Sequence, residues 1–130
     1  MIDYLRHFTT TPEGKILYVL AIIACLMIID FISGTIAAII NPNIDFKSSA
    51  GRNGILKRVG AILTLLILIP IGIIIPGDVG IMLVYTLYVG YLLLELKSII
   101  ENLDKMGVNV GPFKIFLNNF EQFVNNKRNQ

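Results

Sequence analysis

Polar side chains recur at helical spacing inside two otherwise apolar stretches, and their chemistry needs an explanation. In the first stretch, residues 16–40, Asp30 is followed by Ser33 and Gly34. An ionised aspartate at the centre of a membrane helix costs about 2.5–3.5 kcal/mol on insertion scales. Asp30 is therefore expected to have polar partners or to contact water. Gly34 and Ala38 form a small-residue pair that lets another helix approach closely.

A second polar stripe lies in the apolar stretch that starts at Gly80. Its members alternate spacings of three and four residues, which keeps them on one side of a helix: Tyr88, Tyr91, Glu95, Ser98 and Asn102. Counting about 1.5 Å per residue predicts that Tyr88, Tyr91 and Thr64 lie at about the depth of Asp30. Two interpretations stay open. The groups form a hydrogen-bonded latch, or they are hidden in one state and line water when subunits assemble.

The sequence contains no motif that indicates an enzyme or a metal site. The single histidine, His7, has no Ser, Cys or acidic partner arranged near it, and the single cysteine, Cys25, lies within an apolar stretch. No glycine-rich phosphate loop or metal-ligand spacing occurs. The basic connector between the first two apolar stretches is short and poor in aromatics, which argues against nucleic acid. We expect no enzyme activity, no cofactor and no metal.

Membrane-spanning helices must position these polar residues. Of the 130 residues, 55% are hydrophobic and 15% are charged, and the mean hydropathy is +0.72. This composition is too apolar for a soluble domain of that length. We expect an all-α membrane protein with one domain over residues 1–130 and spans at about 16–40, 55–75 and 79–98. Two spans plus a re-entrant segment are the alternative.

Local signals place several ends of these helices. Thr11 followed by Pro12 is a typical helix start, because the hydroxyl caps the helix and proline fits its first position. Asn41-Pro42 predicts the end of the same helix. Gly77, within Pro76-Gly77-Asp78, predicts a tight turn between the second and third spans.

The distribution of basic residues predicts the orientation in the membrane. The connector carries Lys47, Arg52, Lys57 and Arg58, the turn at 77–80 carries no basic residue, and Lys97 begins a further basic set. The positive-inside rule places the connector and the C-terminus in the cytoplasm and the N-terminus outside. Arg52, Lys57, Arg58 and Lys97 are expected to hold the inner boundary.

The tail, at about 112–126, has the pattern of an amphipathic helix. Its apolar side chains recur at offsets of three and four: Phe113, Phe116, Leu117, Phe120, Phe123 and Val124. Asparagine and glutamine occupy the other face. Three placements stay open: on the inner leaflet, against another subunit, or covering the helical bundle from below.

Three motifs occur in order along the chain: DFISGTIAAI at 30–39, SSAGRNGILKR at 48–58 and LELKSIIENLDKMGVNVGP at 94–112. Together they resemble phage holins of Gram-positive hosts, in the group that also includes clostridial toxin-secretion holins. Small holins of short-tailed phages are the most similar in length.

This resemblance implies a multi-pass protein of the host bacterial cytoplasmic membrane. Homo-oligomers of such proteins form lesions in the membrane, and endolysin, or in some relatives a toxin, crosses through these lesions. The formation of the lesions thereby sets the time of host lysis. The implied partners are other copies of the chain, the bilayer and endolysin, with no catalytic residue and no cofactor. An antiholin, or a small adaptor that forms no pore, is the alternative.

Overall fold

The computed structural model describes residues 1–43 and 48–128, so Lys47 lies outside the described residues. The elements are α1 (Ile2–Phe8), α2 (Pro12–Ile40), α3 (Ser48–Ile74), α4 (Val79–Lys105) and α5 (Gly111–Arg128). Within this part of the chain, three segments are long and apolar enough to cross a membrane: Pro12–Ile40, Gly51–Ile74 and Val79–Lys105. The prediction of an all-helical fold with three candidate spans and a C-terminal helix is confirmed.

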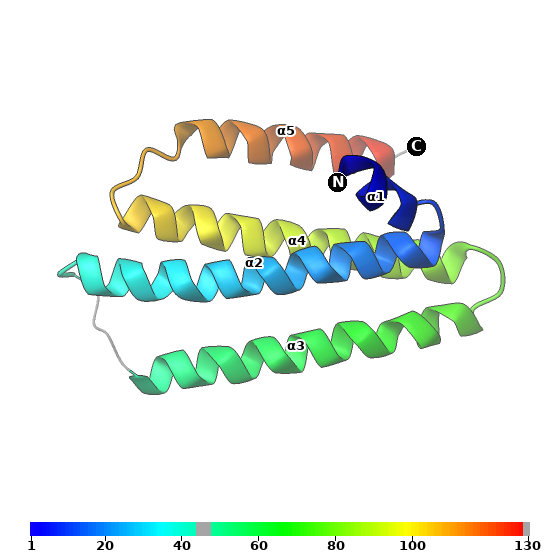
Figure 1. Cartoon of the computed structure of the whole chain (residues 1–130), viewed down its shortest axis with the longest axis horizontal. Coiled ribbons are helices and arrows are strands. Elements are labelled where there is room, and N and C mark those ends of the chain that lie inside the picture. Colours follow the sequence, from blue (N-terminus) through cyan, green and yellow to red (C-terminus); the bar gives the residue numbers. More distant parts are fainter. Residues whose placement is uncertain (44–47, 129–130) are drawn as a thin grey trace.

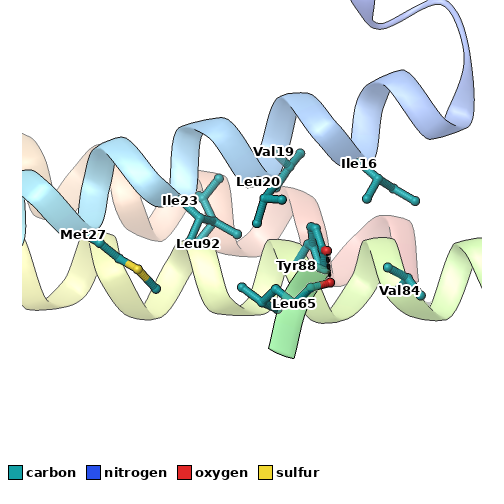
Figure 2. Close-up of a cluster of buried hydrophobic side chains, with 9 residues drawn as sticks. All are labelled: Ile16, Val19, Leu20, Ile23, Met27, Leu65, Val84, Tyr88 and Leu92. Atoms are coloured by element: carbon teal, nitrogen blue, oxygen red, sulfur yellow. Dashed lines mark hydrogen bonds between the residues drawn. The ribbon is translucent and has the colours of Figure 1, made fainter. Parts of the chain in front are cut away.

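The helices α2, α3 and α4 lie side by side, with α2 and α4 running in one direction and α3 in the other (Figure 1). One dry core cluster joins all three helices (Figure 2): Ile16, Val19, Leu20, Ile23 and Met27 from α2, Leu65 from α3, and Val84, Tyr88 and Leu92 from α4. Tyr88 is fully buried, and its hydroxyl donates a hydrogen bond to the Leu65 carbonyl. This tyrosine therefore fastens α4 to α3 within the apolar core.

The helix ends follow the local signals. The Thr11 hydroxyl accepts a hydrogen bond of 3.0 Å from the Gly14 amide, and Pro12 opens α2. Gly77 adopts φ +72°, which a glycine accepts without steric cost, in the turn between α3 and α4. The predicted capped start and the predicted turn are both confirmed.

Each long helix extends beyond the apolar window from which its span was predicted. α2 begins at Pro12, as the Thr11-Pro12 signal predicted, which is before the apolar window that starts at Ile16. α3 begins at Ser48 rather than near Ile55, and α4 continues to Lys105 rather than Ser98. Hydropathy marks where side chains stop being apolar, whereas backbone hydrogen bonds continue until a cap or turn ends them. The extra turns of α4 change which of its residues face α2.

Close contact between two glycines fixes the α3–α4 hairpin. A Cβ atom at Gly80 would clash with the Gly72 carbonyl oxygen, and one at Gly72 would lie 2.7 Å from Cγ2 of Val84. Both glycines are buried. The absence of side chains here lets the end of α3 and the start of α4 touch backbone to backbone.

The tail helix α5 folds back along the side of α4 (Figure 1), and its C-terminal part lines a cleft with Pro12 and Lys15 at the start of α2. Leu117 of α5 is buried with Leu93 and Ile100 of α4. This arrangement differs from a helix covering the bundle from below, because α5 runs beside α4 rather than across its end.

The glycine contact generates a prediction. Gly80→Ala is expected to lower the free energy of unfolding in detergent by about 1–3 kcal/mol, because the added methyl overpacks the hairpin. Gly90→Ala is the matched control, since a Cβ there meets nothing within 4 Å. Unfolding is followed by circular dichroism in mixed micelles. Equal stability of the two variants would show that the glycine contact does not hold the hairpin.

Candidate functional site

Asp30 is the centre of a polar cluster that joins all three candidate spans. Its residue is 5% exposed, and its carboxylate accepts hydrogen bonds from both neighbouring helices. Arg58 Nη2 of α3 donates to Oδ2 at 2.9 Å and forms a salt bridge. Ser98 Oγ and Asn102 Nδ2 of α4 donate to Oδ1 at 2.8 and 2.7 Å. The expected polar partners of Asp30 are therefore present, and they come from α3 and α4.

Asn102 ties a second layer of α2 to α4. Its Nδ2 also lies 3.1 Å from the Asp30 carbonyl oxygen and 3.1 Å from Ser33 Oγ, and Ser33 Oγ donates to the same carbonyl at 3.1 Å. A Cβ at Gly34 would lie 3.4 Å from Asn102 Nδ2. Gly34 is thus the small residue that leaves room for this amide.

Glu95 brings a second acid to the cluster. Glu95 lies one turn before Ser98 on the same stripe of α4, and its Oε2 is buried without a hydrogen-bond partner among the described residues. Arg58 Nε is likewise buried without a hydrogen-bond partner among the described residues. The guanidinium also lies 5.9 Å from the centre of the Phe31 ring. Part of the hydrogen-bonding capacity of the Arg58 guanidinium is therefore unused.

The structure separates three predicted residues from this cluster. Thr64 is exposed and donates to the Gly60 carbonyl of its own helix at 2.9 Å, and Tyr88 donates to Leu65. Tyr91 packs beside the dry core. The prediction that Thr64, Tyr88 and Tyr91 lie at the depth of Asp30 was wrong. The residues of α4 that lie opposite Asp30 are Ser98 and Asn102.

The ends of α2 and α4 explain this difference in depth. Asn41 Nδ2, at the end of α2, donates to the Lys105 carbonyl at 3.3 Å, so the two helices end together. The predicted register assumed that the third span stops near Ser98. Because α4 continues to Lys105, the residues beside Asp30 come from later in the polar stripe.

The basic residues predicted at the inner boundary divide into two groups. Arg58 turns into the bundle, with 28% of its side chain exposed, so its role as a boundary residue is corrected to that of an Asp30 partner. Lys97 Nζ lies 3.2 Å from Glu121 Oε1 of α5. Arg52 and Lys57 are exposed, and their contact with lipid stays a prediction.

Sequence reasoning missed both ion pairs, although one signal was available. A buried acid requires a compensating base, and Arg58 immediately precedes the second apolar stretch. The Lys97–Glu121 pair had no such signal, because it depends on α5 folding back along α4.

The three motifs noted in the sequence meet at this cluster. Asp30 begins the first motif, Arg58 ends the second, and Glu95, Ser98 and Asn102 lie in the third. A model of the bacteriophage holin family matches residues 7–123. The chain belongs to the bacteriophage holin family. The resemblance based on the motifs is thereby confirmed, and as a holin-family member the chain is a non-enzymatic membrane protein.

Curated relatives of this holin-family chain include proteins named antiholin. The antiholin of Bacillus phage phi29 is 31% identical over 130 residues, which cover 100% of this chain and 97% of the relative. The antiholin of Bacillus phage PZA is 30% identical with the same coverage. That of Bacillus phage B103 is 32% identical over 103 residues, covering 79% of this chain and 76% of the relative. No solved structure matches the chain.

The buried ion pair of this holin-family chain generates a stability prediction. Arg58→Leu is expected to lower the free energy of unfolding in mixed micelles by about 3 kcal/mol, because it leaves the Asp30 carboxylate without its base. The double variant Asp30→Leu/Arg58→Leu should lose at least about 1 kcal/mol less than the sum of the single variants. Lys57→Leu, at the exposed neighbouring position, is the control. Additive losses would mean that Asp30 and Arg58 do not stabilise each other.

Proposed function

We propose that the chain is a holin that assembles in the cytoplasmic membrane of a bacterial host. Its homo-oligomers form lesions that release endolysin and so time lysis. The observation that carries this proposal is the buried polar cluster of Asp30, Arg58, Ser98 and Asn102, which joins three candidate spans of a holin-family protein. A protein that must stay harmless and then open needs polar groups that are covered first and exposed later.

The cluster supports such a two-state role through its solvation. In the closed bundle, hydrogen bonds satisfy Asp30, while Glu95 Oε2 and Arg58 Nε lack partners within residues 1–43 and 48–128. Unpaired buried polar groups cost free energy, and water removes that cost. When several copies associate and the cluster turns toward a water-filled lesion, the unpaired atoms gain partners. Hydration therefore favours the open assembly.

The membrane potential provides a trigger for this transition. A charge that moves through the field gains or loses about 2.3 kcal/mol per 100 mV. Asp30 and Arg58 carry opposite charges on different helices, so the field acts on α2 and α3 in opposite directions. Collapse of the potential changes the balance between the closed bundle and the assembly.

The proposed orientation places the N-terminus outside and the connector end in the cytoplasm. Arg52 and Lys57 are exposed near the start of α3, where they can contact anionic lipid headgroups. The turn at Gly77 carries no basic residue and would face outward. Lys97 contributes to the same inner boundary less directly, because it pairs with Glu121.

An antiholin function is the second candidate, and the names of the curated relatives favour it. Relatives that match along nearly their full length are named antiholin. A chain with the same spans could join holin assemblies through the same helix contacts and delay their opening. The two functions therefore differ in the outcome of assembly rather than in fold.

Induction in a Bacillus host separates the two functions. For a holin, we expect abrupt growth arrest and loss of membrane potential, followed by lysis only when an endolysin is co-expressed. Potential is measured with a voltage-sensitive dye, and culture turbidity reports lysis. Continued growth, together with delayed lysis when an established holin is co-induced, would reject the holin function in favour of the antiholin. Continued growth without such a delay would reject both.

The polar cluster predicts altered timing in a single variant. Asp30→Leu is expected to shift the onset of lysis by at least about twofold, because it removes the group around which the three spans close. Thr64→Leu is the matched control, since Thr64 bonds only to its own helix among the described residues. Membrane fractions are blotted to confirm equal accumulation. Unchanged timing and unchanged oligomers in Asp30→Leu would exclude the cluster from the mechanism.

A further inference from the structure

The tail helix α5 accompanies α4 along nearly the whole of its candidate span. At one end Leu117 packs with Leu93 and Ile100, near the C-terminal part of α4. At the other end Lys127 lines a cleft of about 530 Å³ with Ile81 and Met82, near the start of α4. A bilayer crossed by α4 therefore also surrounds α5 in this arrangement.

The composition of α5 is unlike that of the three candidate spans. Its outward side carries exposed side-chain amides, beside which Ile115, Phe116 and Phe123 are also exposed: Asn118, Asn119, Gln122, Asn125 and Asn126. The helix is not among the segments apolar enough to cross a membrane alone. Yet it has 18 residues, a length of about 27 Å at about 1.5 Å per residue. This length approaches the hydrocarbon thickness of about 30 Å.

The charges of α5 are distributed as in a helix that crosses a membrane. Lys114 lies near its start and Lys127 near its end. Lys127 shares the cleft with Lys15 and lies 4.9 Å above the Phe123 ring, so basic groups gather where headgroups would lie. Between the two lysines the only charged residue is Glu121, which Lys97 of α4 neutralises at 3.2 Å.

Lipid is a poor environment for the amide side of α5. Side-chain amides without hydrogen-bond partners are costly in hydrocarbon, whereas polar faces are tolerated where they line a water-filled cavity. The exposed side chains of α3 and α4 include many large apolar groups that suit lipid, among them Leu63, Ile67, Leu83 and Leu87. Water therefore belongs on the α5 side of the bundle and lipid on the α3 side.

We propose that docked α5 crosses the bilayer beside α4 and that its amide face lines the aqueous lumen of the lesion. The C-terminus then lies on the outer side with the start of α2, and not in the cytoplasm, where the positive-inside rule places it. The lining role rests on the proposed holin function, whereas the transverse position of α5 does not. Each copy in the assembly contributes one such amide face, and the apolar surfaces of the candidate spans face lipid or other copies.

The depth of α5 is tested with single tryptophans, because the natural chain contains none. Phe113→Trp, Phe116→Trp, Phe120→Trp and Phe123→Trp are placed separately in vesicles with lipids brominated at defined depths. A transverse α5, whose midpoint lies next to Phe120, gives the deepest quenching at Phe120, intermediate quenching at Phe116 and Phe123, and the shallowest quenching at Phe113. Equal interfacial depth at all four positions would overturn the proposal, because α5 would then lie on the surface.

Water contact is tested with single cysteines in a Cys25→Ala background. Gln122→Cys is compared with Leu87→Cys, an exposed apolar position of α4, during dye release from the vesicles. We expect a charged thiol reagent to label Gln122→Cys at least tenfold faster once release begins. Equal labelling rates during normal release would overturn the lining role and leave the holin function intact. Failure of the unmodified chain to release dye would reject the holin function and the lining role together, while the depth series would still report the position of α5.

Discussion

A carboxylate removed from water must find hydrogen-bond donors, and Asp30 imposes this requirement on the whole bundle. Its donors come from both neighbouring helices, Arg58 from α3 and Ser98 and Asn102 from α4. Apolar contacts alone leave helices free to rotate or slide in a bilayer, because lipid satisfies apolar surfaces as well as a neighbouring helix does. The Asp30 cluster removes this freedom, since its donors meet the carboxylate only in one register.

The bundle is divided along its length into a dry part and a polar part, and α3 is the helix least held by either. Of the apolar windows, 39% of that in α2 is buried but only 11% of that in α3. Leu65, together with the partly buried Ala61, Ile62, Leu68 and Ile69, provides its apolar contact, and Arg58 provides its polar one. Separation of α3 therefore exposes less buried surface than separation of α2 would. Among the three candidate spans, α3, which carries Arg58, is thus also the least buried.

The sequence predicted the elements of the fold more fully than their contacts. Thr11 and Gly77 marked a helix start and a turn correctly, and apolar windows located three candidate spans. Those windows contained no information on the register between α2 and α4, which depends on where α4 ends and on the contact of Asn41 with Lys105. The choice of Tyr88 and Thr64 as neighbours of Asp30 failed for this reason. The pairing of Lys97 with Glu121 depends on lateral packing of the tail, which hydropathy does not encode.

The backbone contact between Gly72 and Gly80 holds one end of α3, so the rest of the helix can act as a lever about that end. From Gly72 back to Arg58 the helix is about 21 Å long at about 1.5 Å per residue. A tilt of about 10° at the pivot would move Arg58 by about 4 Å over that length. Such a displacement is larger than the 2.9 Å that separates Arg58 Nη2 from the Asp30 carboxylate. A small angular change at the glycine contact is thus amplified into loss of the direct hydrogen bond between Arg58 and Asp30 at the far end of α3.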